Sequence, residues 1–130
     1  RSLLAGKRVV VVDDSVVRGT TSKKIIRLIR EQGGAREVHL RVASPPVAWP
    51  CFYGIDMPTK KELVASGRSV EEIRDFLGVE TLNYLSLDGM LGACSGVKEN
   101  FCHACFSGEY RIAKDVIRAV ISKEEKKATV

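Results

Sequence analysis

The sequence predicts an α/β protein built on a parallel sheet. Two observations carry this prediction: a run of valines at residues 9–12 leads into a helical pattern from about Thr21 to Gln32, and a strand pattern follows at residues 38–42. Strand, helix and strand in close succession form a βαβ unit, in which the strands are parallel and the crossover is right-handed. With 130 residues, the chain is long enough for one domain with a sizeable core.

Composition and charge narrow the class of protein further. Hydrophobic residues make up 45% of the chain and charged residues 28%, as in ordinary soluble domains. No apolar run reaches about 18 residues, and residues 1–6 are too short for a signal peptide, so we expect a cytoplasmic protein with no membrane partner. The net charge of +5 comes without a basic stripe interleaved with aromatic residues, so we expect no nucleic-acid partner.

The first expected element is a strand at residues 9–12. Its β-branched residues fit a strand that is buried on both faces of a parallel sheet. Asp13 and Asp14 follow at its carboxyl end, where open α/β sheets bind ligands. The chain begins with Arg1, and a sheet whose ligand loop comes first lacks neighbours on one side. We therefore expect a fragment of a longer protein.

Residues 15–21 form a short loop, rich in hydrogen-bond donors, between these acids and the first helix. The hydroxyls of Ser15, Thr20 and Thr21 and the N–H groups of the helix N-terminus can bind phosphate oxygens, and Gly19 lets the backbone approach closely. The two acids would repel a phosphate, so we expect them to bind a sugar diol or a hard cation such as Mg²⁺. The alternative is an ordinary strand-turn-helix in which Thr20 or Thr21 is the N-cap.

The segment VVVVDDSVVRGTTSK resembles, over its whole length, the phosphoribosyl pyrophosphate (PRPP) signature of the type I phosphoribosyltransferases. The resemblance implies that Asp13 and Asp14 hold the ribose 2′ and 3′ hydroxyls of PRPP and help to place Mg²⁺. It also implies the parallel-sheet fold of that family, of which this chain would be a C-terminal portion. The loop implied to hold the 5-phosphate consists of Ser15, Val16, Val17, Arg18, Gly19, Thr20 and Thr21.

Glycines at 33–34 should end the first helix, and apolar and polar residues alternate in the strand that follows at 38–42. His39 points outward in this strand and is expected to be exposed and not catalytic. Residues 47–58 contain two prolines and a glycine, which predict a packed loop near the ligand end. The aromatic residues of this loop are expected to pack against the protein and not to stack on a base.

The second half of the chain completes a single partial phosphoribosyltransferase domain. Residues 1–90 should form the sheet, its helices and the PRPP loop, and residues 91–130 a C-terminal loop and helix. Capping boxes and glycines place the remaining elements. These are a short helix that begins with the capping box at 59–62 and is ended by Gly67, a second from Ser69 ended by Gly78, a strand at 81–86, a helix capped by Asp88 and a final amphipathic helix at 112–121.

The chain contains four cysteines, Cys51, Cys94, Cys102 and Cys105. Disulfides are not expected in a cytosolic chain with an adequate core. The C-x-x-C motif at 102–105 suits Zn²⁺, an iron–sulfur cluster or a redox pair. Because the motif lies in a predicted loop and not between a strand and a helix, we favour a metal, with Cys51 as a third ligand.

The segments VHLRVASPPVAWPCFYGIDMPTKKELVA and FCHACFSGEY resemble the amidophosphoribosyltransferases, which open de novo purine synthesis. In the cluster-bearing branch of that family, the resemblance implies that Cys51, Cys102 and Cys105 bind a structural [4Fe–4S] cluster. No cysteine precedes Cys51, so the fourth ligand would lie upstream of this chain. Cys94 could instead complete a four-thiolate set, His103 could complete a zinc site, or the thiols could bind no metal.

The same resemblance implies a reaction and its partners. Ammonia derived from glutamine displaces pyrophosphate from PRPP to give 5-phosphoribosylamine, purine nucleotides inhibit the enzyme by feedback, and the enzyme is a homotetramer. The glutaminase domain is not in this sequence, so we expect no catalytic residue here and no full reaction from this chain alone. The alternatives are a base-salvage phosphoribosyltransferase, which has no need of the cysteines, and a non-catalytic regulator that senses PRPP or nucleotides.

Overall fold

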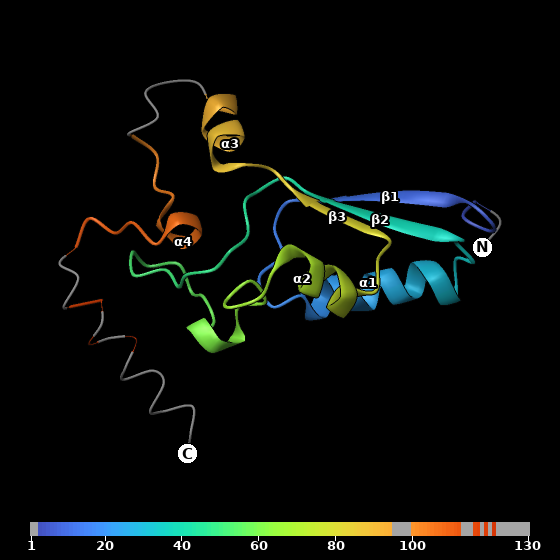
Figure 1. The fold of residues 1–130 in the computed structure, drawn as a ribbon, viewed down its shortest axis with the longest axis horizontal. Helices are drawn as coiled ribbons and strands as arrows, with labels where there is room; N and C mark the ends of the chain where they lie inside the picture. Colours follow the sequence, from blue (N-terminus) through green and yellow to red (C-terminus); the bar gives the residue numbers. More distant parts are fainter. Residues whose placement is uncertain (1–2, 95–99, 113–115, 118, 120, 122–130) are drawn as a thin grey trace, which may run out of the picture.

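The computed structural model describes residues 3–94, 100–112, 116–117, 119 and 121. Strands β1 (Arg8–Asp13), β2 (Glu37–Val42) and β3 (Thr81–Tyr84) form a parallel sheet in the order β1-β2-β3 (Figure 1). In this register Val11 lies opposite Leu40, and Leu40 lies opposite Leu82. The structure therefore confirms the predicted α/β class and the parallel sheet.

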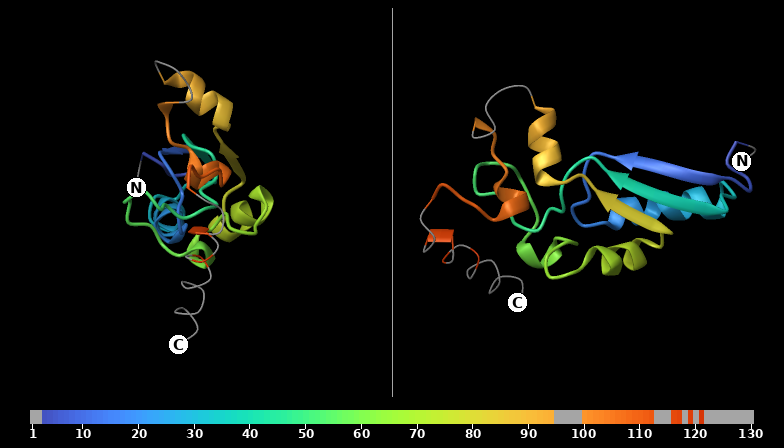
Figure 2. Two further views of the ribbon diagram at one scale, coloured as in Figure 1. Left: turned by 90° about the vertical axis from the view of Figure 1, so that its left-hand side faces the viewer. Right: turned by 45° about the horizontal axis from the view of Figure 1, so that its top comes forward.

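Two helices cover one face of this sheet. Helices α1 (Thr20–Glu31) and α2 (Val70–Leu77) lie side by side below the strands in Figure 1, and both views in Figure 2 place them on the same face. Between helices and sheet lies one apolar core, because alternate residues of β2 and one side of each helix point inward. The core consists of Val16, Ile26, Val38, Leu40, Val42, Val64, Ala65, Ile73, Leu77, Val79 and Leu82.

The opposite face of β1 is exposed, which corrects one prediction. The valine run was expected to be buried on both faces, yet Val10 is 60% exposed and Val12 73% exposed. The reason is the alternation of a strand: Val11 points toward the core, whereas its neighbours point to the face that neither α1 nor α2 covers. A run of valines thus predicted the strand correctly but not the layers around it.

His39 is not the exposed residue that alternation suggested. Its side chain is only 13% exposed, and its ring lies between strands β2 and β3. Nδ1 is 2.9 Å from Oγ1 of Thr81, and Nε2 is 3.3 Å from a carboxylate oxygen of Glu37. Neighbouring side chains on the same face of the sheet therefore cover it, and these contacts give it a structural role.

The capping boxes predicted helix α2 correctly, but they predicted the helix expected before it only in part. Ser69 caps α2 in a capping box, and Gly78 ends it in a left-handed conformation. The helix expected from Thr59 to Gly67 is only a single 3₁₀ turn, η1 (Lys60–Glu62). The chain leaves this turn extended because Leu63 and Val64, both almost fully buried, enter the interior.

The remaining helices lie beyond the carboxyl ends of the strands (Figure 1). Ser86, not Asp88, caps α3 (Leu87–Ala93), because β3 ends earlier than expected. A further helix, α4 (Ala104–Ser107), begins inside the C-x-x-C segment, which was predicted to be a loop. Half of the amphipathic helix expected at 112–121, residues 113–115, 118 and 120, lies outside the described residues. Among the described helices, none combines the length and the apolarity needed to cross a membrane.

Candidate functional site

The loop after β1 begins with two acids that nearby groups hold in place. Asp13 is half-buried at the end of β1, and its Oδ1 accepts the N–H of Asp14 at 3.1 Å. Ser15 Oγ donates to Asp14 Oδ1 at 3.2 Å, and Ser22 Oγ lies 3.5 Å from Asp13 Oδ2. Because Ser22 belongs to the first turn of α1, its contact holds the carboxylate of Asp13 beside the N-terminus of that helix.

Gly19 is the N-cap of α1, so the alternative of a threonine N-cap is wrong. Its φ of 74° is left-handed, and a Cβ at this position would lie 3.0 Å from Phe76 Cε1 and 3.3 Å from Leu77 Cδ2. Within the described residues, no side chain caps the first turn, and that turn contains no acidic residue. Its N–H groups and the positive end of the helix dipole therefore suit an anion.

A cleft of about 360 Å³ opens at this point. It contains every residue of the predicted PRPP-binding set except Val16, which is 1% exposed and belongs to the core beneath the loop. The cleft also includes Ser22 and Ile25, which were not predicted as site residues. Their position in the first two turns of α1, directly after the loop, could have indicated that they line the same cleft. The cleft is lined by Asp13, Asp14, Ser15, Val17, Arg18, Gly19, Thr20, Thr21, Ser22 and Ile25.

Arg18 lines this cleft and forms an ion pair with Glu62 of η1. Oε1 of Glu62 accepts Nη2 of Arg18 at 3.0 Å and Nε at 3.2 Å. Oε2 accepts the N–H and the hydroxyl of Thr59 at 2.9 and 2.8 Å. These hydrogen bonds from Thr59 lower the pKa of Glu62, and the guanidinium of Arg18 lowers it further. The backbone N–H of Val64 also donates to the carbonyl of Val17 at 2.8 Å, so two contacts attach the loop to the segment after η1.

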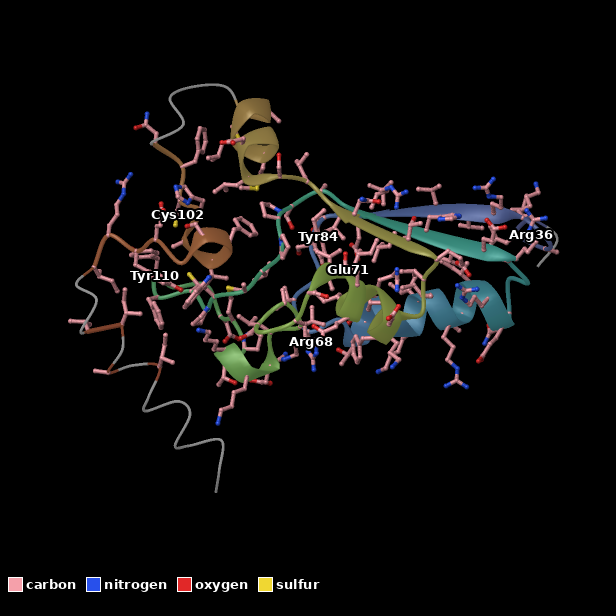
Figure 3. All side chains as sticks on the ribbon, viewed as in Figure 1. Arg36, Arg68, Glu71, Tyr84, Cys102 and Tyr110 are labelled. Carbon is pink, nitrogen blue, oxygen red and sulfur yellow. The ribbon has the colours of Figure 1, made fainter. Side chains whose placement is uncertain are left out.

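The cysteine-bearing segments form a second region, at the end of the molecule far from Arg36 (Figure 3). The carbonyl of Cys105 accepts the N–H groups of Ala48 and Trp49 at 3.1 and 3.0 Å. These two hydrogen bonds join the C-x-x-C segment to the loop that contains Cys51. Segments more than 50 residues apart in sequence therefore meet where the resemblance implied a shared site.

Three of the thiols are electrostatic neighbours. Burial raises the pKa of the Cys105 thiol, and its proximity to the thiol groups of Cys102 and Cys51 raises it further. Cys94 lies at the end of α3, where its Sγ donates to the carbonyl of Met90 at 3.5 Å. In the part of the chain that the structure describes, no three potential ligands lie close enough to hold a single metal ion.

Aromatic rings support the loop around Cys51, as predicted. The ring centroids of Phe52 and Tyr110 are 4.9 Å apart, and those of Tyr53 and Tyr110 are 6.2 Å apart. The hydroxyl of Tyr110 donates to the carbonyl of Pro50 at 2.6 Å, and the N–H of Arg111 donates to the hydroxyl of Tyr53 at 2.7 Å. Burial raises the pKa of Tyr110 to about 12, with a smaller contribution from the nearby thiols.

Trp49 is the centre of a further contact between this region and η1. Nζ of Lys60 lies 3.7 Å from the centroid of the Trp49 ring, a cation–π contact. Gly108 lies so close to the Trp49 ring that a Cβ at this position would be 2.7 Å from Trp49 Cε2. Glycine is therefore required at position 108, where φ is also left-handed at 76°.

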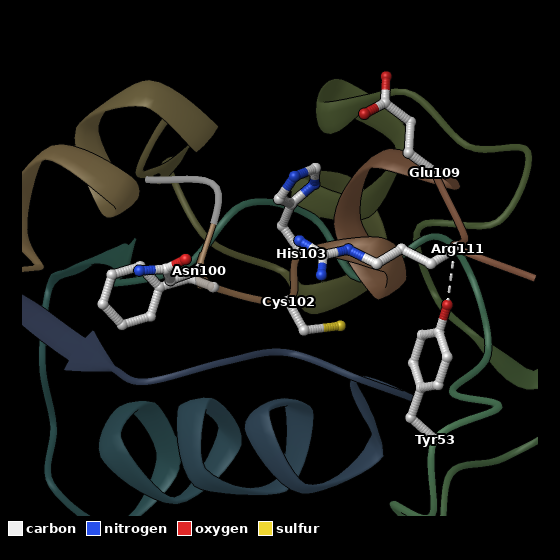
Figure 4. Close-up of a pocket in the computed structure, with 7 residues that line it drawn as sticks. Tyr53, Asn100, Cys102, His103, Glu109 and Arg111 are labelled. Carbon is white, nitrogen blue, oxygen red and sulfur yellow. Dashed lines mark hydrogen bonds between the residues drawn. The ribbon is translucent and has the colours of Figure 1, made fainter. Parts of the chain in front are cut away.

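A hollow of about 260 Å³ adjoins Cys102 (Figure 4). The figure shows Tyr53 and Arg111 on one side of it and Asn100 on the other, with Cys102 and His103 between them. Nδ1 of His103 is 2.9 Å from Oγ of Ser107, so this imidazole is bound to its own helix. This contact engages one of the two ring nitrogens of His103.

Comparisons with known proteins identify relatives that all bear one name. The chain matches no model of a protein family. Over 122 residues it is 50% identical to "Amidophosphoribosyltransferase, chloroplastic" of Vigna aconitifolia, a match that covers 94% of this chain and 25% of that protein. It is also 51% identical over 117 residues to the amidophosphoribosyltransferase of Bacillus subtilis, with 85% of this chain and 24% of that protein covered. The chain thus spans about a quarter of the length of these relatives.

Solved structures give the same result. The fold matches the "structure of the allosteric regulatory enzyme of purine biosynthesis" with a TM-score of 0.77 at 48% identity, over 88% of this chain and 26% of that one. It matches the glutamine PRPP amidotransferase of Bacillus subtilis complexed with ADP and GMP with a TM-score of 0.77 at 49% identity. Over the region that it matches, this chain is therefore homologous to the amidophosphoribosyltransferases and has the phosphoribosyltransferase fold of those structures.

Proposed function

We propose that this chain provides the ribose- and 5-phosphate-binding part of an amidophosphoribosyltransferase. That enzyme forms 5-phosphoribosylamine from PRPP and glutamine in the first step of purine nucleotide synthesis. The observation that carries the proposal is the cleft after β1, which is lined by eight of the nine predicted residues, all except the core residue Val16. Relatives at about half identity bear the name of this enzyme, which supports the same assignment.

In this proposal the two ends of the cleft have different tasks. The unpaired N–H groups at the start of α1, with the hydroxyls of Thr20 and Thr21, bind the 5-phosphate. Asp13 and Asp14 accept hydrogen bonds from the ribose hydroxyls. Displacement of pyrophosphate needs little covalent chemistry from the protein, so these residues position the substrate and no general base is assigned among them.

The donor set of this cleft also fits Mg²⁺. Asp13 and Asp14 supply adjacent carboxylate oxygens, the ligands that Mg²⁺ prefers, and both reach the cleft. When bound together with PRPP, Mg²⁺ would neutralise charge on the leaving pyrophosphate. Asp14 is exposed and Asp13 half-buried, so neither carboxylate is confined by the core.

The thiols of Cys51, Cys102 and Cys105 fit a [4Fe–4S] cluster better than a single ion. A cluster occupies the space between its ligands, so its sulfurs lie farther apart than those around one metal ion. The three thiols are neighbours, yet no set of three ligands among the described residues is close enough for a single ion. We propose that the cluster joins the loop around Cys51 to α4 and takes its fourth ligand from outside this chain.

Two other functions are less well supported. A base-salvage phosphoribosyltransferase would share the cleft but would not need the contact between the two cysteine segments. A regulator that senses PRPP or nucleotides would share both the cleft and the contact between the cysteine segments. Only a measurement of PRPP turnover separates such a regulator from the enzyme. The proposal also includes glutamine-derived ammonia as a substrate, feedback inhibition by purine nucleotides, a homotetramer and a cytoplasmic location. Some of the relatives, by contrast, are named chloroplastic.

The test uses the encoded protein that contains this chain. We expect Asp13→Asn combined with Asp14→Asn to abolish Mg²⁺-dependent PRPP turnover while the circular dichroism spectrum stays unchanged. Asp75→Asn is the matched control, because Asp75 is an exposed acid paired with Arg74 on α2, and turnover should survive it. Retained turnover in the double variant would show that the cleft is not the PRPP site.

A further inference from the structure

The ion pair between Arg18 and Glu62 has a geometry that bears on phosphate binding. A guanidinium has five N–H donors. Glu62 Oε1 takes one from Nε and one from Nη2, at 3.2 and 3.0 Å. This side-on contact leaves the two donors of Nη1 and the second donor of Nη2 for another anion. Since Arg18 lines the cleft, its remaining donors are available at the place where a phosphate would bind.

Glu62 is itself held in position. Its second oxygen accepts two hydrogen bonds from Thr59, the backbone N–H at 2.9 Å and the hydroxyl at 2.8 Å. This capping box fixes the carboxylate on η1, so that the carboxylate can fix the guanidinium in turn. The side chains of Arg18 and Glu62 are 52% and 47% exposed, and an ion pair with that exposure contributes little to stability. The main effect of this ion pair is therefore to orient the guanidinium of Arg18.

We infer that Glu62 is a positioning residue for phosphate binding, which acts by orienting the guanidinium of Arg18 at the cleft. The inference rests on the proposed function, because it takes the anion to be the 5-phosphate of PRPP. A carboxylate near a phosphate also repels it, and this opposing effect predicts that loss of Glu62 would tighten binding. The two effects differ in sign, so a single substitution distinguishes them.

The experiment compares two glutamates that share a capping role. Glu62→Gln removes the charge beside Arg18, and Glu72→Gln removes the corresponding carboxylate of the second capping box, where Glu72 accepts the N–H of Ser69 at 2.7 Å. In the encoded protein, we expect Glu62→Gln to raise the KM for PRPP about fivefold, the size of the effect of one ordinary hydrogen bond, with kcat within about twofold. Glu72→Gln should leave both constants unchanged.

A double-mutant cycle tests whether Glu62 acts through Arg18. On an Arg18→Ala background, Glu62→Gln should have no further effect on the KM for PRPP. An undiminished effect there would overturn the inference, as would an unchanged or lower KM in the single variant. Isothermal titration of the unmodified protein with PRPP and Mg²⁺ tests the proposed function separately. If the unmodified protein fails to bind PRPP, the proposed function fails; if it binds and Glu62→Gln has no effect, only the inference about Glu62 fails.

Discussion

Arg30 in α1 donates through Nη2 to both carboxylate oxygens of Glu80, at 2.8 and 2.7 Å, and to the carbonyl of Gly78 at 2.8 Å. The same carboxylate accepts the N–H of Val38 at 2.6 Å. Glu80 precedes β3, and Val38 lies at the start of β2. One carboxylate therefore joins α1 to two strands at the end of the sheet opposite the loop after β1.

Glu80→Gln should lower the free energy of unfolding by about 1 kcal/mol, because it loses a charge-assisted hydrogen bond but not the packing around it. The expected loss of unfolding free energy is small because the side chains of Arg30 and Glu80 are 31% and 37% exposed, so that water screens their attraction. Urea denaturation at neutral pH measures the change. Glu31→Gln is the matched control, since its pair with Arg27 is more exposed and should contribute less than about 0.5 kcal/mol. Equal losses in the two variants would contradict the prediction.

The same variant should remove part of the pH dependence of stability. The hydrogen bond from Arg30 holds the pKa of Glu80 below 4.5, partly opposed by burial and assisted by the N–H of Val38. A lowered pKa stabilises the fold above the unfolded value and loses that contribution as pH falls through the folded value. The difference in unfolding free energy between the parent and Glu80→Gln should therefore shrink below about pH 4.5.

Gly19→Ala should both destabilise the fold and weaken PRPP binding. It forces a side chain into a left-handed φ of 74° and places its Cβ 3.0 Å from Phe76. We expect a loss of about 2 to 3 kcal/mol, from backbone strain plus crowding. Gly78→Ala is the control, because its φ is 73° and nothing lies within 4 Å of its Cβ, so only the strain of about 1 kcal/mol remains. Thermal unfolding of both variants checks this, and equal losses would exclude the crowding.

The elements that the sequence predicted best carry strong local signals. Alternation in β2, the capping box at Ser69 and the glycines after α1 each depend on neighbouring residues, and the structure confirms all three. The first capping box misled, since the burial of Leu63 and Val64 extends the chain immediately after η1. A capping box indicates where a helix begins but does not determine its length, which tertiary packing decides.

In the candidate site too, local sequence predicted some features, whereas contacts between distant residues could not be predicted. The PRPP loop could be predicted because its residues are contiguous, and all of them except Val16 line the cleft. The pair between Arg18 and Glu62 could not be predicted, because it joins residues 44 apart that meet only after the chain has folded. The backbone hydrogen bond from Trp49 to Cys105 also joins segments that are distant in the sequence. Such long-range contacts leave no periodic signal in the sequence.

Iron content should distinguish the three clustered cysteines from the fourth. In the encoded protein, purified without oxygen, we expect Cys51→Ser, Cys102→Ser and Cys105→Ser each to lose most of the bound iron and sulfide. Cys94→Ser should retain them, because the thiol of Cys94 contacts the carbonyl of Met90 on its own helix. Elemental analysis and visible absorbance measure the result. Bound zinc in the parent protein, or equal losses in all four variants, would contradict the cluster.

Two tyrosine-to-phenylalanine variants should change stability in opposite directions. Within the described residues, the hydroxyl of Tyr84 is buried without a hydrogen-bond partner, whereas that of Tyr110 donates to Pro50 at 2.6 Å. A buried unpaired hydroxyl costs free energy, so Tyr84→Phe should leave the free energy of unfolding unchanged or raise it by up to about 1 kcal/mol. Tyr110→Phe should lower it by about 1 kcal/mol, because the carbonyl of Pro50 loses its donor. Urea denaturation of both variants tests the contrast, and a loss in Tyr84→Phe as large as that in Tyr110→Phe would mean that the Tyr84 hydroxyl is hydrogen-bonded in the protein.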